Sequence, residues 1–574
     1  MSFVADPTVD LDSFFLLGRI LYLFAFLTWV VWLLRSGRSV GFLAPTFLAL
    51  LFWAINTYPM QRPYGLFEPG DRLRNLWWSA TAAAGNSPWE SGVGGGASLE
   101  PFWATLVSVL ALRDPGLVIK IYPFLPALGI ILMGLSLGTT FRRSVGRRAA
   151  EHSPGPSDGD RCALFVVFFV LLASTQPLDY IGAYHGSLWK TILLKPNHVL
   201  GFALVPVCAA VVAGPMTVRR SVLAVALIGL LGWVFVIHWV LFSWCVVLFA
   251  VVGLLTRISS LTNGIRLLVI LLLASILVAP YVYFLRTNFE TAVSLSPSWT
   301  PGAPKLSPWG ESPPRGYSLL FIVTVDLGLN FFLALWGSWA AWRRRSRFDL
   351  MWLSIAAGTY SAWAVSAVLY ETGRARGAAH VYVFVMFTVA VFAGLGAMDL
   401  VQRFASWFTP NPQSRMAALN RITAGVLLLL LPVSVPWWFR PHVMDSHFRA
   451  ALDPLPGHLV SLGTWIRSHT RGSDTFLAGP SIAPWIPALS GRRVLGIGRA
   501  PHDSPSYWDE CAIVFPANVE EAREVAVRLR LAYVVADPSL LEEHVLPWDH
   551  FDRDPFFEKV HEDGSIRVYH LRYP

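Results

Sequence analysis

Two carboxylates flank a Pro-Gly turn in residues 58–101, the first long polar stretch of the chain. Glu68 precedes the turn, Asp71 follows it, and Trp77 and Trp78 come shortly afterwards. A carboxylate can accept a proton in general base catalysis, and indole rings anchor a loop at a membrane surface. The pattern therefore fits chemistry on a lipid-linked substrate. A surface loop with a tight turn and an aromatic anchor fits the same residues.

A second stretch with chemical potential lies between residues 180 and 200. It contains a cluster of basic and polar side chains: His185, Lys190, Lys195, Asn197 and His198. Lysines supply the counter-charge for a phosphate group, so an anionic ligand is one explanation of this cluster. Lysines that extend to lipid headgroups, together with histidines that cap helices, are the other explanation.

Three further places carry polar groups without an obvious structural reason. Arg374 and Arg376 could grip a pyrophosphate through their forked guanidinium groups, or could bind lipid headgroups or pair with Glu371. Asp326 lies within an apolar run, where an ionisable side chain is costly and suggests a function. A hydrogen bond to a neighbouring helix is the alternative for Asp326. His238 stands between two short apolar runs, which is typical of a solvated turn residue.

The composition places these residues in a membrane protein. Of the 574 residues, 54% are hydrophobic and only 14% are charged, whereas a soluble domain carries about 25% charged residues. The net charge of +9 does not call for a nucleic-acid partner, because most clustered basic residues lie in short loops between apolar runs. The four cysteines show neither metal-ligand spacing nor a disulfide framework.

Apolar runs of about 20 residues can cross a bilayer as helices, and the chain contains about 12 candidates. We expect transmembrane spans at residues 14–34, 41–57, 117–141, 161–177, 197–214, 221–237, 239–256, 264–286, 317–342, 348–370, 379–403 and 422–439. A shorter apolar run, residues 102–112, predicts a re-entrant or interfacial helix.

The basic clusters predict how these spans are oriented. Every cluster follows an odd-numbered span, as Arg219 and Arg220 follow the fifth. Because cytoplasmic loops are enriched in lysine and arginine, we expect both termini to lie outside the cell membrane. The long polar loops at residues 58–101, 178–196 and 287–316 are then extracytoplasmic as well.

The last part of the chain changes character, with more charged residues and shorter apolar runs. We expect helices at residues 459–469 and 519–531, and strands at residues 474–478, 493–496, 533–536 and 566–571. The sequence therefore predicts a multi-span transmembrane domain in residues 1–439 and a small soluble extracytoplasmic α/β domain in residues 440–574.

This architecture resembles the GT-C superfamily of polytopic membrane glycosyltransferases, as a bacterial-type member. The first outside loop carries Glu68-Pro-Gly-Asp71 where that superfamily keeps its acidic motif. The tail is similar as well, with a helix that ends in WIRSHT, the segment APWIPALSGRRVL, and the strands LAYVVADP and VYHL. The resemblance implies a GT-C-like helical fold. It also implies transfer of a sugar from a polyprenyl-phosphate donor to a glycan, lipid or protein acceptor on the extracytoplasmic face.

The resemblance further implies roles for the polar residues. Asp71 would be the general base or a ligand of a divalent metal such as Mg²⁺ or Mn²⁺, with Glu68 assisting, and Trp77 and Trp78 would stack on a sugar or anchor the loop. The residues expected to hold the donor phosphate are His185, Lys190, Lys195, Arg374 and Arg376. Three more residues join the candidate substrate-binding set: Asn197, His198 and His238.

Two other classes of function fit the same composition. A transporter or flippase of a lipid-linked or anionic substrate would use Asp326, Arg19 and His238 to line a path through the bilayer. A membrane scaffold or sensor would use the tail to bind a partner. The enzyme interpretation differs from the scaffold interpretation because it requires the outside polar residues to converge in space.

Overall fold

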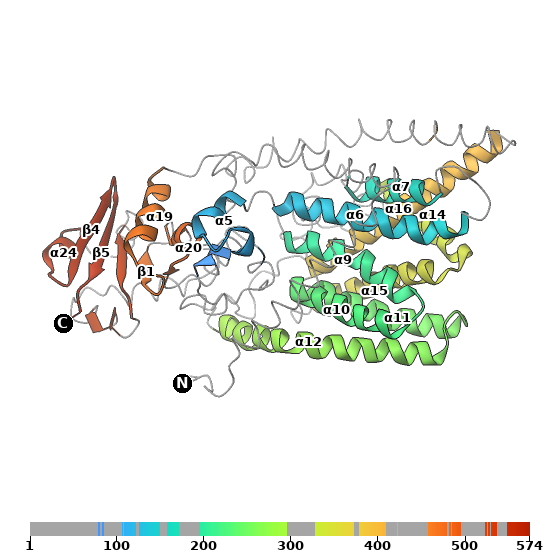
Figure 1. The fold of residues 1–574 in the computed structure, drawn as a ribbon, viewed down its shortest axis with the longest axis horizontal. Coiled ribbons are helices and arrows are strands. Elements are labelled where there is room, and N and C mark those ends of the chain that lie inside the picture. The colour runs from blue at the N-terminus through green and yellow to red at the C-terminus, as the bar shows by residue number, and fades with distance from the viewer. Residues whose placement is uncertain are drawn as a thin grey trace.

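The computed structural model describes most, but not all, of the chain. With short gaps, it describes residues 79–84, 106–149, 158–171, 196–294, 328–371, 378–408, 457–494, 523–536 and 548–573, together with residue 422. The described helices form a bundle at one end of the molecule, and a small sheet with its own helices lies at the other end (Figure 1).

Nine described helices build the bundle. They are α6 (Leu125–Ala149), α7 (Asp158–Leu171), α9 (Pro196–Ala213), α10 (Val218–Val234), α11 (Val236–Leu255), α12 (Leu261–Ser294), α14 (Gly328–Arg344), α15 (Arg347–Glu371) and α16 (Ala378–Phe408). Three stretches of the described chain are long and apolar enough to cross a membrane: Val236–Leu255, Leu261–Tyr283 and Val383–Trp407. The fold is therefore mostly helical and suited to a bilayer. The spans expected at residues 14–34 and 41–57 lie outside the described residues.

The expectation of one span over residues 117–141 is wrong. The chain instead forms a short helix, α5 (Pro115–Ile121), and then α6, which starts at Leu125. Two prolines account for the break. Pro123 lies between the helices in the sequence, and the residue before a proline is disfavoured in a helix. Pro126 falls in the first turn of α6, where a proline is tolerated.

Glycines allow three of the bundle helices to approach one another closely. A Cβ built on Gly337 of α14 would lie 2.0 Å from the carbonyl oxygen of Phe392. A Cβ on Gly396 of α16 would lie 2.0 Å from the carbonyl oxygen of Leu333. Gly394 meets the backbone of Val166 on α7 in the same way, at 2.7 Å. Small residues at helix crossings are typical of membrane bundles, where close packing replaces the hydrophobic effect.

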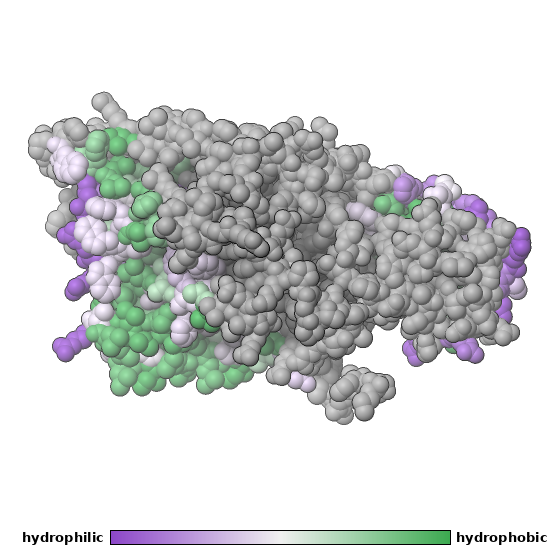
Figure 2. Space-filling view, turned by 180° about the vertical axis from the view of Figure 1, so that it is seen from behind, coloured by the Kyte–Doolittle hydropathy of each residue, from purple (hydrophilic) through white to green (hydrophobic). Residues whose placement is uncertain are grey.

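One end of the bundle gathers arginines and tryptophans. Arg266 at the start of α12 donates to the carbonyl oxygen of Met216, in the α9–α10 turn, at 3.1 Å. Arg403 of α16 lies over the rings of Trp336 and Trp339 of α14, at 5.3 Å from each centroid. Figure 2 shows hydrophilic residues along this end and an apolar surface beside it. The grouping agrees with the predicted parity of the basic clusters, and cationic and aromatic side chains are typical of a membrane interface.

A mixed five-stranded sheet forms in the last part of the chain. Its strands are β1 (Thr475–Ala478), β2 (Arg493–Val494), β3 (Tyr533–Ala536), β4 (Phe557–Asp563) and β5 (Ile566–Leu571), in the order β2-β1-β3-β5-β4. The first three strands in this order run parallel, and β5 and β4 are antiparallel to their neighbours. The helices beside the sheet are α19 (Gly457–His469), α20 (Trp485–Ser490) and α24 (Trp548–Arg553).

Candidate functional site

Two histidines from separate helices meet inside the bundle. His198 lies in the first turn of α9 and His238 in the first turn of α11. Their ring centroids are 5.0 Å apart and the rings meet edge to face. Both side chains are 0% exposed. The structure thus brings together two residues of the predicted substrate-binding set that are far apart in the sequence.

Phenyl rings enclose this histidine pair. The ring of Phe235 lies 4.3 Å from that of His198, and the rings of Phe202 and Phe384 lie 4.4 Å and 5.0 Å from that of His238. Phe202 in turn stacks on Phe387 at 4.5 Å. These rings meet the imidazoles at tilted or edge-on angles. An imidazole enclosed in this way has few orientations open to it, because close-packed interiors leave little free volume. The directions in which the ring nitrogens point are therefore fixed by packing.

The position of the His238 ring depends on a glycine in α9. A Cβ built on Gly201 of α9 would lie 2.1 Å from Nδ1 of His238. Real Cβ atoms do not approach another atom so closely, so a larger residue at position 201 would displace the imidazole. Gly201 therefore lets the His238 ring lie against the backbone of α9, one turn after His198.

The expectation that His238 is a solvated turn residue is wrong. The break between α10 and α11 falls at Phe235, which is extended with φ −159° and ψ 107°. The chain re-enters a helix at Val236, so His238 is already helical and faces the core. The sequence pattern places the break at His238 because that residue is polar. The break lies at Phe235, whose ring packs against His198.

The pair lies at the end of the bundle opposite to the arginine-rich turns. His198 is at the start of α9, and the turn that contains Met216 follows the other end of the same helix. The predicted outside loop at residues 178–196 enters α9 just before His198. The nitrogens of an imidazole ring can donate or accept a hydrogen bond. The buried histidine pair therefore lies at the helix end that follows the basic segment in the sequence.

Most other expected site residues lie outside the described part of the chain. These residues are Glu68, Asp71, Trp77, Trp78, His185, Lys190, Lys195, Asp326, Arg374 and Arg376. Asn197 falls in the first turn of α9, beside His198. The predicted convergence of Asp71 with the two basic segments stays a prediction.

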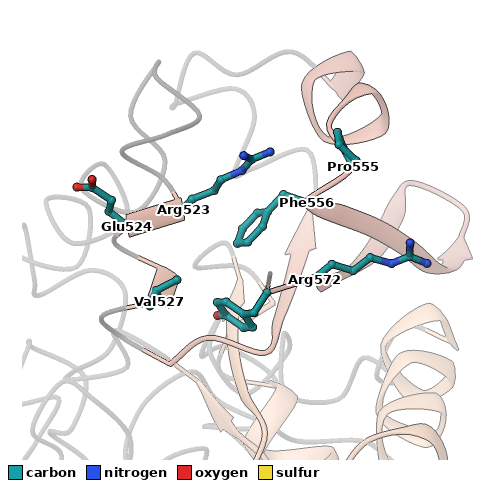
Figure 3. Close-up of a pocket in the computed structure, with 7 residues that line it drawn as sticks. Arg523, Glu524, Val527, Pro555, Phe556 and Arg572 are labelled. Atoms are coloured by element: carbon teal, nitrogen blue, oxygen red, sulfur yellow. The ribbon is translucent and has the colours of Figure 1, made fainter.

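A cavity of about 640 Å³ opens beside the sheet (Figure 3). It is lined by Arg523, Glu524, Val527, Pro555, Phe556, Arg572 and Tyr573. Its cations already have carboxylate partners: Arg523 pairs with Asp554 at 2.7 Å, and Arg572 donates to Glu558 at 2.8 Å. The sequence analysis did not single out these residues, because they come together only when β4, β5 and the preceding segment pack. The paired charges indicate a structural role for both arginines.

Comparison with known proteins yields a likeness in fold. The chain matches no protein-family model and no curated protein. Among solved structures, it is similar to the Archaeoglobus fulgidus oligosaccharyltransferase in complex with Zn and sulfate. The two are 16% identical, the match covers 86% of this chain and 68% of that chain, and the TM-score is 0.45.

The fold is also similar to ArnT from Cupriavidus metallidurans. The form bound to undecaprenyl phosphate is 14% identical and the apo form is 15% identical. Each match covers 91% of this chain and 97% of that chain, with a TM-score of 0.48. Oligosaccharyltransferase and ArnT are both GT-C membrane glycosyltransferases, the superfamily that the sequence resembles.

Proposed function

We propose that the chain is a membrane glycosyltransferase of the GT-C kind, which moves a sugar from a polyprenyl-phosphate donor to an acceptor on the extracytoplasmic face. One observation carries the proposal. His198 and His238 meet at the end of the bundle away from the arginine-rich turns. In the sequence, the basic segment at residues 178–196 leads directly into α9, whose first turn contains His198. A basic segment that leads into this buried pair at the predicted outside end is suited to a lipid phosphate.

The proposed reaction exchanges one bond at the anomeric carbon of the sugar for another. The hydroxyl oxygen of the acceptor forms a bond to that carbon, and the bond from the carbon to the phosphate oxygen breaks. Asp71 takes the hydroxyl proton, with Glu68 assisting. Polyprenyl phosphate leaves with the bonding electron pair, and cationic donors stabilise its growing charge. The donors in this proposal are His185, Lys190, Lys195, Arg374 and Arg376.

The histidine pair has a positioning role in this scheme. Packing of His198 against Phe235 and His238 fixes the first turn of α9. That turn contains Asn197 and directly follows Lys195 in the sequence. A small displacement of groups that hold a reacting phosphate can cost about 100-fold in rate. The buried pair would thus set where the basic segment ends.

A divalent metal such as Mg²⁺ or Mn²⁺ belongs to the proposal through Asp71 and Glu68, because carboxylate oxygens are the ligands that these ions prefer. The histidine pair fits such an ion less well. In the part of the chain that the structure describes, no group of three or more His, Cys, Asp or Glu side chains is placed so that it could hold a metal ion. A metal held by the two carboxylates would neutralise charge on the leaving phosphate.

The proposed setting is the cell membrane, with both termini and the long polar loops on the extracytoplasmic side. The apolar outer surface of α12 supports the lipid bilayer as a partner, since side chains such as Leu268, Leu272 and Ile276 are more than half exposed. Glycans, lipids and proteins can all present a hydroxyl group on the extracytoplasmic side, so all three are acceptor classes in this proposal.

The experiment that tests the proposal follows both products. Purified protein in liposomes receives a polyprenyl-phosphate donor with a radiolabelled sugar and a cell-envelope fraction as acceptor. We expect polyprenyl phosphate to be released and the label to enter the acceptor. Asp71→Asn should abolish both while the variant stays folded. Movement of the intact donor across the bilayer without its cleavage would contradict the proposal and favour a flippase.

A further inference from the structure

A short piece of the first polar loop is buried against the last part of the chain. In residues 79–84, Ser79 and Ala80 are 0% exposed and Ala83 is 3% exposed. The segment contains a helical turn, in which the amide of Ala84 donates to the carbonyl oxygen of Ala80 at 3.0 Å. This burial is unusual for a loop, because loops in general run over the surface.

The partner of this turn is Gly491, which follows α20. Gly491 has φ +70°, a conformation that glycine adopts without steric cost. A Cβ built on it would lie 2.6 Å from the carbonyl oxygen of Ala80 and 2.6 Å from the Cβ of Ala84. The same Cβ would lie 3.1 Å from Cγ of Pro115, at the start of α5. Gly491 therefore contacts both the turn at residues 79–84 and the start of α5.

A second contact holds α5 to the same surface. Asp114 caps α5 by accepting from the amide of Gly116 at 2.8 Å, and Pro115 occupies the first turn. Arg467 of α19 lies over this turn, since a Cβ on Gly116 would be 2.6 Å from its Nη1. Arg467 also donates to the carbonyl oxygen of Leu489, at the end of α20, at 2.8 Å. Figure 1 shows α5 beside α20, between the sheet and the bundle.

The surface that receives these elements is itself rigidly built. The guanidinium group of Arg492 donates to the hydroxyl and the carbonyl oxygen of Thr470 at 3.0 Å and 2.8 Å, and to the carbonyl oxygen of Arg467 at 3.2 Å. Arg492 is only 9% exposed, and this burial lowers its pKa. These bonds join the end of α19 to Arg492, the residue directly after Gly491.

We propose that the α19–α20 surface of the C-terminal region is a positioning platform for the first polar loop, with Gly491 as its central contact. The inference rests on the proposed function, in which Asp71 is the general base. Asp71 precedes Ser79 by eight positions in the sequence. A turn anchored so close in the sequence limits how far the carboxylates can move. Preorganised groups act well only when a second layer of contacts holds them.

The experiment uses three variants of the full-length protein in lipid nanodiscs. Gly491→Ala adds a Cβ that must push the turn away. Ala84→Leu enlarges the same contact from the other side and leaves Gly491 unchanged. Gly564→Ala is the matched control, because Gly564 has φ +59° and a Cβ there meets nothing within 4 Å. Hydrogen exchange at residues 79–84 and in α5 is compared with exchange in β1 and β3, and donor cleavage is measured as kcat and KM.

We expect Gly491→Ala and Ala84→Leu to raise exchange at residues 79–84 and in α5 by about tenfold or more, with β1 and β3 still protected. We expect kcat to fall about tenfold with little change in the KM for the donor. Gly564→Ala introduces the same kind of backbone strain at a positive φ, but it should leave exchange at residues 79–84 and in α5, and kcat, as in the wild type.

Two results would overturn the platform. The first is unchanged exchange at residues 79–84 in both test variants, and the second is raised exchange with an unchanged kcat. Absence of donor cleavage by the wild type would refute the proposed function instead. In that case the platform would have no catalytic role. The exchange data would still decide whether the contact between Gly491 and residues 79–84 exists.

Discussion

The imidazole of His238 lies against the backbone of Gly201, so that a Cβ at position 201 would be 2.1 Å from Nδ1. This relationship lets the first turn of α11 approach α9 closely enough for His238 to meet His198 at 5.0 Å. The candidate site therefore depends on a residue that carries no chemistry of its own.

Gly201→Ala should destabilise the bundle. The added methyl group must displace a buried ring, and overpacking of this kind costs about 1–3 kcal/mol. Thermal unfolding in detergent would measure the loss. Gly264→Ala is the control, because a Cβ there meets Leu254 at an ordinary contact distance of 3.4 Å. Equal unfolding temperatures for the two variants would show that the close approach of His238 is not needed for packing.

His198→Phe should separate packing from chemistry. A phenyl ring fits between Phe235 and Phe202, so we expect stability to stay within about 1.5 kcal/mol of the wild type. The phenyl ring should keep the first turn of α9 in place, so under the positioning role we expect sugar transfer to stay within about threefold of the wild type. The control is Phe387→Leu, which disturbs the stack on Phe202 without removing a polar group. A loss of about tenfold or more in a stable His198→Phe protein would contradict the positioning role and would show that the imidazole itself is needed.

Gly337→Ala should weaken the crossing of α14 and α16. The new methyl group would meet the carbonyl oxygen of Phe392 at 2.0 Å, and a backbone atom cannot move aside as a flexible side chain can. We expect a loss of about 3 kcal/mol or more, seen as a lower yield of folded protein and a lower unfolding temperature. Ser338→Ala, at the neighbouring and partly exposed position, should change little. A stable Gly337→Ala protein would contradict the close crossing.

The sheet should lose stability at alkaline pH through two tyrosines. Burial raises the pKa of Tyr569 from 10.0 to about 12, and burial raises that of Tyr573 from 10.0 to about 12 as well. Because the folded state holds these protons more tightly, their stabilisation is complete below about pH 10 and is lost as the pH rises towards 12. Unfolding followed by circular dichroism over this range would measure the loss.

Tyr573→Phe provides the comparison for this pH dependence. The Tyr573 hydroxyl donates to the carbonyl oxygens of Ala526 and Leu531. The variant should therefore be less stable near neutral pH, but should lose less stability between pH 10 and pH 12 because phenylalanine cannot ionise. A loss identical to that of the wild type would show that this hydroxyl does not contribute.

Sustained apolar runs made several helices predictable from the sequence. The helices α9, α12 and α16 start close to the expected positions 197, 264 and 379. The β-branched segments at Tyr533–Ala536 and Ile566–Leu571 form strands where expected. In these cases hydrophobic periodicity and burial agree, so local sequence is sufficient.

Features that depend on packing could not be predicted in this way. The strand β4 carries Glu558, Lys559 and Glu562 at a sheet edge, so it lacks a buried alternating pattern. The contact of His198 with His238 requires Gly201 to bring α9 and α11 together. The burial of residues 79–84 depends on Gly491, which lies in a distant part of the sequence. Each of these contacts exists only in the folded chain.

The central claim is that the phosphate of a lipid-linked donor is held at the end of the bundle where His198 and His238 meet. The most direct test is photo-crosslinking of the protein in liposomes with a polyprenyl-phosphate sugar that carries a photoreactive group next to the phosphate, followed by mass spectrometry. We predict labelled peptides from residues 178–202 and from the first turn of α11, with labelling reduced by excess unmodified donor. Labelling confined to the arginine-rich end around Arg343 and Arg403 would contradict the account.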